Sequence, residues 1–150
     1  MSRDSLGKTL HIVLSELEET INTHIKALRA LKIACIKLKK GEHVEKHLES
    51  RIKAIKRIRN EIMKSLKSFE ESKEPVDEEL ASEIVAMVVY IEMSAIKDEK
   101  RYLLIAKKLL EKTGSRLDIE EDLIDLEEIS RSAKKIIEKY TNFNSIVDHP

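Results

Sequence analysis

The sequence has little of what β proteins, disulfide-bonded proteins and aromatic pockets are built from. Its 150 residues include three glycines, two prolines, one cysteine, three tyrosines, two phenylalanines and no tryptophan. Because so few residues favour tight turns, the composition excludes an all-β fold with its many turns. A single cysteine excludes a framework of disulfides. The few aromatic side chains argue against a base-stacking surface or an aromatic-lined ligand pocket.

Long apolar runs are also missing. The longest covers residues 84–91, whereas a membrane-spanning helix needs about 20 apolar residues. The first 20 residues carry scattered charge and no apolar stretch of the kind found in signal peptides. We therefore expect a cytoplasmic protein with no transmembrane segment. The abundance of isoleucine, lysine and glutamate, with no glutamine, is typical of thermophile proteins.

What the sequence does contain is helical periodicity. Hydrophobic residues make up 41% of the chain and charged residues 37%, and the apolar residues recur at alternating steps of three and four. This pattern predicts an all-α protein, an antiparallel four-helix bundle with long coiled-coil-like helices. We expect a single domain over residues 1–140, followed by a flexible tail over residues 141–150. The predicted helices run over about 5–39, 43–72, 77–112 and 119–140.

The steps of three and four identify the residues expected to face the core. In the first helix these are Leu10, Leu14, Leu17, Ile21, His24, Leu28, Leu31, Cys35 and Leu38. In the second they are Val44, Leu48, Ile52, Ile55, Ile58, Ile62, Leu66 and Phe69. In the last they are Ile119, Leu123, Leu126, Ser130, Ala133, Ile137 and Tyr140.

Two of these core positions carry side chains with chemistry of their own. His24 is either a pH switch or a polar residue that has its hydrogen bonds satisfied or sets the register of the bundle, and we favour the second interpretation. We expect His24→Leu to keep the fold and to raise stability by roughly 1 kcal/mol or more, because an imidazole loses hydration when buried among apolar residues. Cys35 is expected to pack in the core, since no histidine lies within reach along its helix to activate the thiol.

Charge is divided between the two halves of the chain. Residues 1–67 hold 16 Lys and Arg against 8 Asp and Glu, and residues 68–150 hold 12 against 20, so the halves carry +8 and −8. We interpret the cations of the first two helices as a polyanion-binding stripe, against which the acidic half packs. The alternative is a solvated helix face. The stripe residues are Lys26, Arg29, Lys37, Lys40, Lys46, Arg51, Lys53, Lys56, Arg57, Arg59, Lys64 and Lys67.

The predicted hairpin resembles a known family. Residues 36–42 (Ile-Lys-Leu-Lys-Lys-Gly-Glu) and residues 55–61 (Ile-Lys-Arg-Ile-Arg-Asn-Glu) are similar to the helical hairpin of ESCRT-III proteins, including the archaeal cell-division members. The resemblance covers residues 30–67. It implies a hairpin that binds acidic membrane and polymerises, with later helices packing back to close the subunit. The second helix of this chain is rich in isoleucine, whereas that of the family is rich in alanine.

The sequence contains no evident catalytic motif. His43 and His47 share a helix face, but Val44 stands where zinc hydrolases need a glutamate directly after the first histidine. The acidic residues 120–128 do not reproduce the spacing found in all-α nucleotide pyrophosphohydrolases. We therefore expect no catalytic residues, no metal site and no cofactor.

These observations predict a non-enzymatic interaction or assembly protein. Its basic hairpin is expected to bind an anionic partner, either a membrane surface or an acidic protein, and self-association is a further expectation. The first alternative is a helical nucleic-acid-binding subunit of a ribonucleoprotein complex. The second alternative, an all-α metal-dependent hydrolase, rests only on the run of acidic residues.

Overall fold

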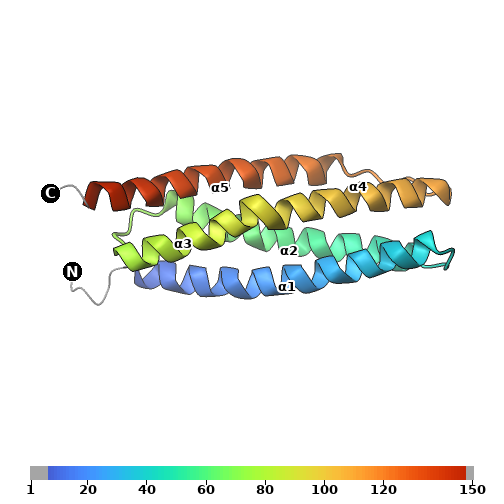
Figure 1. Cartoon of the computed structure of the whole chain (residues 1–150), viewed down its shortest axis with the longest axis horizontal. Coiled ribbons are helices and arrows are strands. Elements are labelled where there is room, and N and C mark those ends of the chain that lie inside the picture. The colour runs from blue at the N-terminus through green and yellow to red at the C-terminus, as the bar shows by residue number, and fades with distance from the viewer. Residues whose placement is uncertain (1–6, 148–150) are drawn as a thin grey trace.

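The computed structural model describes residues 7–147, without the side chains of Lys8 and residues 143–147, and 86% of the described residues are helical. The predicted four-helix bundle is confirmed (Figure 1). The third helix of the bundle consists of two α-helices that a π-helical segment, Ile91–Ala95, joins into one continuous helix. The α-helices are α1 (Lys8–Lys39), α2 (Glu45–Glu71), α3 (Glu78–Tyr90), α4 (Ile96–Lys112) and α5 (Glu120–Val147).

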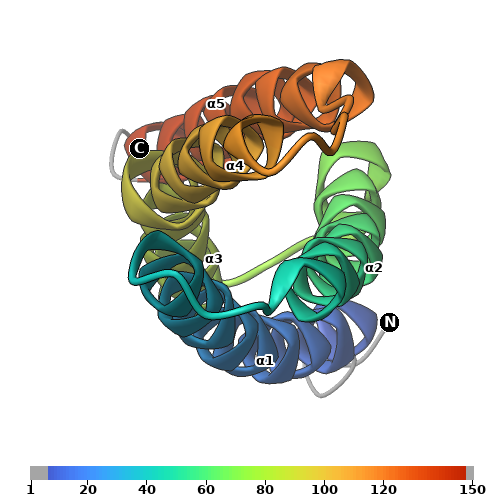
Figure 2. The same ribbon diagram turned by 90° about the vertical axis from the view of Figure 1, so that its right-hand side faces the viewer.

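The helices form a ring in which each packs against two neighbours (Figure 2). α1 lies between α2 and the continuous α3–α4 helix, and α5 closes the ring on the opposite side. Counting α3–α4 as one helix, consecutive helices run in opposite directions, so the α1–α2 turn and the α4–α5 loop lie at one end of the bundle (Figure 1). We call this the turn end. α1 has 32 residues and is therefore about 48 Å long at 1.5 Å per residue.

The helix limits differ from the predictions at two places. α1 begins at Lys8 because Gly7 has a left-handed φ of +68°, and residues 5 and 6 of the predicted helix lie outside the described part. A Cβ on Gly7 would lie 2.3 Å from Cδ2 of Leu80 in α3, so the Leu80 side chain would have to shift, and the positive φ of Gly7 itself favours glycine. The predicted end of the last helix at residue 140 is wrong, because α5 continues to Val147; residues 148–150 are not described, and the flexibility of the tail stays a prediction. No glycine or proline follows Tyr140 before Pro150 to end the helix.

The core-facing pattern predicted for α1 is confirmed, since all nine positions are buried. In α5 the prediction is wrong at three of its seven positions: Leu123, Ser130 and Ile137 are half-buried. The inward positions there are Asp122, Ile129 and Ile136, each one residue earlier than predicted. The predicted and the observed inward residues differ by a rotation of the helix about its axis. The prediction chose Leu123 instead of Asp122 because it considered hydrophobicity alone.

Side chains from α5 form hydrogen bonds with the backbone at the end of α2. Lys139 Nζ donates hydrogen bonds to the carbonyl oxygens of Phe69 at 2.9 Å, Glu70 at 3.2 Å and Ser72 at 2.6 Å. The hydroxyl of Tyr140 also donates to the Phe69 carbonyl, at 2.9 Å. A cation at a helix C-terminus satisfies carbonyls that have no partner in the helix and faces the negative end of the helix dipole.

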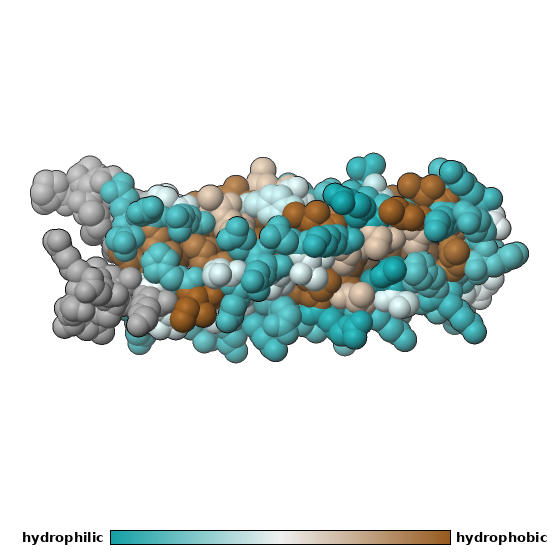
Figure 3. Space-filling model, turned by 90° about the horizontal axis from the view of Figure 1, so that it is seen from below, coloured by the Kyte–Doolittle hydropathy of each residue, from teal (hydrophilic) through white to brown (hydrophobic). Residues whose placement is uncertain are grey.

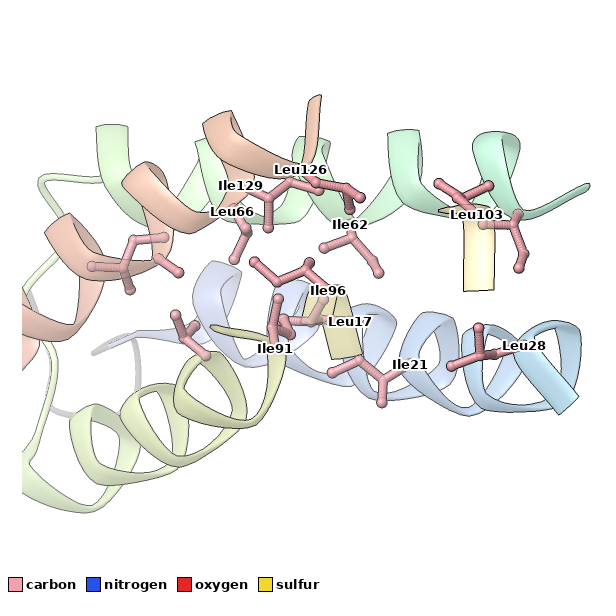
Figure 4. Packing of buried hydrophobic residues seen from close by; sticks show 14 of the residues in the cluster. Leu17, Ile21, Leu28, Ile62, Leu66, Ile91, Ile96, Leu103, Leu126 and Ile129 are labelled. Carbon is pink, nitrogen blue, oxygen red and sulfur yellow. The ribbon is translucent and has the colours of Figure 1, made fainter. Parts of the chain in front are cut away.

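The core is continuous along the bundle and the outside is strongly polar. Apolar side chains from all four helices meet along the axis (Figure 4). On the face where α1 lies, hydrophilic side chains predominate and hydrophobic ones form separate patches (Figure 3). Among the described residues, no helix combines the length and the apolar character needed to span a membrane.

Candidate functional site

Four polar side chains interrupt the apolar core at one level of the bundle. His24, Arg59, Glu99 and Asp122 come from α1, α2, α4 and α5, and their exposed fractions are 1%, 0%, 0% and 6%. We call these four residues the ionic layer. Each is preceded and followed by apolar core residues along its own helix, as Ile21 and Leu28 flank His24 (Figure 4).

Hydrogen bonds connect the ionic layer across the bundle. His24 Nε2 and Glu99 Oε1 are 2.8 Å apart, and Arg59 Nη1 donates to Glu99 Oε2 at 2.5 Å. Arg59 Nη2 donates to Asp122 Oδ1 and, at 3.4 Å, to Oδ2 of the partly exposed Asp125. The guanidinium thus binds carboxylates of two helices through its planar arrangement of donors. Arg59 Nε has no partner among the described residues.

The ionic layer keeps Arg59 charged. Burial alone would lower the pKa of the guanidinium, but the charges of Glu99 and Asp122 and their hydrogen bonds outweigh burial and raise it above its usual value. Together with Asp125, three carboxylates face one arginine, so the cluster carries a formal charge of −2 when His24 is neutral. Removing one partner from such a buried set typically costs about 3–5 kcal/mol, because the remaining charge has no counter-ion.

Arg59 corrects a prediction. The sequence assigned it to the polyanion-binding stripe, and the structure buries it completely, where no external anion can reach it. The spacing of the sequence indicated that Arg59 is buried, because strictly alternating steps of four and three residues lead from Ile55 to Arg59 and then to Ile62. The prediction used Ile58 at this step because it is apolar, and Ile58 is only half-buried.

The π-helical segment brings Glu99 into the ionic layer. The buried residues Val88, Ile91 and Ala95 follow the usual steps of three and four, which would place Asp98 inward next. The wider turn of the π segment accommodates one extra residue, so Glu99 is buried and Asp98 is half-buried. The same shift places Leu103, Ala106 and Leu110 in the core.

The predicted stripe is otherwise at the surface. Ten of its twelve residues are exposed, and Arg51 is half-buried and donates to His47 Nε2 at 3.3 Å. Three form ion pairs: Lys56 with Glu121 at 3.5 Å, Lys64 with Glu61 at 3.3 Å and Lys67 with Glu71 at 3.9 Å. The others form no ion pair among the described residues; they are Lys26, Arg29, Lys37, Lys40, Lys46, Lys53 and Arg57.

These cations concentrate toward the turn end. Residues 26–57 hold 11 Lys and Arg against 3 Asp and Glu. The antiparallel arrangement brings residues 97–112 of α4 to the same end (Figure 1), and they add 6 cations against 3 acids. Acidic residues 118–128 begin α5 there as well, but among the exposed stripe residues that the structure describes, only Lys56 forms an ion pair with one of them. The exposed residues of the stripe therefore remain accessible to solvent when the four helices are packed together.

The remaining candidates form no site. Among the described residues, no three His, Cys, Asp or Glu side chains are grouped so that they could hold a metal ion. The side chain of His43 is 95% exposed, and His47 is engaged by Arg51. Cys35 is buried, and burial raises the pKa of its thiol to about 11, which removes it as a nucleophile near neutral pH.

No protein family, curated protein or solved structure matches this chain. The resemblance of residues 30–67 to the ESCRT-III hairpin stays a prediction.

Proposed function

We propose that the protein docks on anionic membrane surfaces through the cations of α1 and α2. The observation that carries the proposal is the set of seven exposed stripe cations that form no ion pair with the rest of the described chain. Each Lys or Arg close to an anionic lipid surface contributes about 1 kcal/mol of attraction. Several acting together would give firm binding at low salt.

Apolar side chains among these cations favour a membrane over nucleic acid. Ile25, Ile33 and Ile36 of α1 are 37%, 48% and 53% exposed, and Arg29 and Lys37 lie beside them on the same helix. A surface that mixes cations with exposed aliphatic side chains suits the boundary between lipid headgroups and acyl chains. Binding to single-stranded nucleic acid relies instead on aromatic stacking, and α1 and α2 contain only one aromatic residue, Phe69, which is fully buried.

Flotation of the full chain with lipid vesicles tests the proposal. We expect co-flotation with vesicles containing phosphatidylserine, none with vesicles of phosphatidylcholine alone, and a steep loss as salt rises, because screening weakens the attraction. Replacing Lys53, Arg57 and Lys64 together by Glu should abolish binding without unfolding the bundle, since all three are exposed.

The control carries the same change of charge elsewhere. Arg131, Lys134 and Lys135 of α5 are also exposed, and their triple replacement by Glu should leave most of the binding intact. Equal loss in both triple variants would mean that only net charge is sensed, and it would refute a specific stripe. Failure to bind the anionic vesicles at low salt would refute membrane docking, and tighter binding to DNA than to vesicles would favour the nucleic-acid alternative.

A further inference from the structure

A hollow of about 210 Å³ opens at the surface between α1 and the α3–α4 helix, which lie side by side (Figure 2). Its walls include Ile25 and Arg29 from α1 with Tyr90 and Asp98 from the opposite helix. Ile25 and Tyr90 are each 37% exposed, although their side chains are large and mostly apolar. The outer surface formed jointly by these two helices therefore has exposed hydrophobic residues near its middle. We call this surface the shared face.

The shared face is acidic on the side of the hollow away from the turn end. Glu18 precedes Ile25 by seven residues, and Glu83 precedes Tyr90 by seven. Seven residues are about two helical turns, so each carboxylate lies on the same side of its helix as the hydrophobic residue that follows it. Both are exposed, and neither forms an ion pair with another described residue.

Toward the turn end the shared face is basic, beginning with Arg29 at the hollow. Nζ of Lys32 and Cζ of Arg101 lie 4.9 and 5.8 Å from the centre of the Tyr102 ring, so both cations are located where α1 and α4 meet. Lys112 follows Arg101 by eleven residues, or about three turns, and therefore lies on the same side of α4. Among the described residues, Arg29, Arg101 and Lys112 form no ion pair.

Two contacts give the alignment of α1 with the α3–α4 helix. The two helices run in parallel (Figure 1), Gly7 lies beside Leu80, and His24 bonds to Glu99. A residue of the α3–α4 helix is therefore level with the α1 residue whose number is 73 lower before the π segment and 75 lower after it. Every residue of the shared face can thus be placed on one scale along the bundle.

On this scale the acids and the cations are symmetric about one point. Glu83 is level with residue 10 of α1 and Lys112 with residue 37, and these two levels are equally far from a point between residues 23 and 24. Glu18 and Arg29 are equally far from the same point. We infer that a second copy of the chain binds the shared face in the reverse direction, forming a dimer whose two-fold axis passes through this point.

The dimer places opposite charges against each other. Glu18 of each copy lies opposite Arg29 of the other, and Glu83 lies opposite Lys112. A two-fold contact is self-complementary, so each of these pairs forms twice. A second copy bound in the same direction would instead place acids opposite acids and cations opposite cations. Charge complementarity therefore selects the reverse direction.

The residues near the axis are also compatible with this dimer. Tyr90 is level with residue 17 and comes opposite Ile105, which is level with residue 30. Asp98 lies nearest the axis and has Arg101 of the second copy within about one helical turn. Because a single exposed ion pair contributes little, the charges set the direction, and removal of Ile25 and Tyr90 from water supplies the attraction.

Sedimentation equilibrium of the full chain in the absence of lipid tests the dimer independently of membrane docking. At low salt and concentrations up to millimolar, the mass should reach that of two chains and rise no further. Raising the salt to 1 M, where the Debye length is about 3 Å, should increase the dissociation constant at least tenfold. The mass of a single chain at every concentration would refute the inference. Continued growth beyond two chains would refute it as well, because a closed two-fold contact cannot extend.

Reversal of the charges tests the pairing itself. Glu18→Lys with Glu83→Lys, or Arg29→Glu with Lys112→Glu, places like charges opposite each other and should raise the dissociation constant at least tenfold. An equimolar mixture of the two variants restores opposite charges in every pair, so mixed dimers should form with a dissociation constant within threefold of the parent's. All four positions are exposed, so the fold is retained.

The control makes the same change of net charge outside the shared face. Glu127 and Glu138 are exposed on α5, and their joint replacement by Lys should change the dissociation constant less than twofold. An equal loss of the dimer in this control, or a mixture of the two charge-reversed variants that stays monomeric, would overturn the proposed pairing.

Discussion

At the scale of single residues, the ionic layer places a charged arginine where an apolar side chain would usually lie. Burying a charge is costly unless partners compensate it, and Arg59 has carboxylates from α4 and α5 on both nitrogens at the end of its guanidinium. Such pairs are weak evidence of stability, because apolar residues of similar size often serve equally well. Their clearest effect is to specify which helix faces meet.

His24 gives the first prediction, and it reverses the expectation drawn from sequence. His24→Leu removes the hydrogen-bond partner of Glu99 Oε1, which stays buried. Leaving such an acceptor without a partner costs about 1–3 kcal/mol, so the variant should unfold at lower urea than the parent. His11→Leu, on an exposed position of the same helix, should change the free energy of unfolding by less than about 0.5 kcal/mol. A more stable His24→Leu protein would contradict the role of this hydrogen bond.

Tyr140 gives a prediction about alkaline pH. Burial, with a smaller contribution from the charge of Glu74, raises the pKa of its hydroxyl from 10.0 to about 12. Above pH 10 the unfolded chain releases this proton while the folded chain keeps it, so the contribution to stability is complete below pH 10 and is lost between pH 10 and about 12. Urea unfolding at several pH values should show a steeper alkaline loss for the parent than for Tyr140→Phe. Parallel loss in both proteins would contradict the assignment.

At the scale of elements, the helix formed by α3, the π segment and α4 carries one residue more than a regular helix would need. The extra residue lies between Ile91 and Glu99, and the core positions on both sides keep their regular steps. Removing one residue here should therefore convert the π segment to α-helix while every core side chain beyond it keeps its place.

Deletion of Met93, which is 62% exposed, tests this interpretation. We expect helix content close to that of the parent by circular dichroism and a thermal midpoint within a few degrees. Deletion of Leu104, which is 39% exposed and lies beyond the π segment, would turn Ala106 and Leu110 away from the core and should lower the midpoint strongly. If both deletions are equally damaging, the π segment does not absorb an extra residue.

The elements could be predicted from the sequence far better than the ionic layer. Regular steps of three and four residues, with few helix-breaking residues, were enough to predict the four helices and nine buried positions of α1, although Ala34 is buried as well. Arg59 and Asp122 were missed because the patterns of their helices were completed with the nearest apolar residue, and no inward pattern was predicted for the helix that carries Glu99. Burial of a charge is decided by partners on other helices. The shift caused by the π segment has no signature in local propensity.

At the scale of the whole molecule, the halves that differ in charge form a single folding unit. The ionic layer takes one side chain from each of the four helices, and Lys139 of α5 fastens the end of α2. We expect one cooperative thermal transition, with coincident midpoints from far-ultraviolet circular dichroism and from tyrosine absorbance. Two separated transitions would show that the α1–α2 hairpin and the acidic half unfold independently.

The position of Arg59 along the chain has a consequence for folding during synthesis. Glu99 follows it by 40 residues and Asp122 by 63, so a nascent α1–α2 hairpin carries an uncompensated cation on its apolar side. Domains fold from the N-terminus as synthesis proceeds, and exposed apolar surface makes such intermediates prone to aggregate. Closing that surface against another nascent hairpin would bury the cation without a partner, at a cost of several kcal/mol. We therefore expect Arg59, which links α2 to α4 and α5 in the folded protein, to disfavour the pairing of two nascent hairpins.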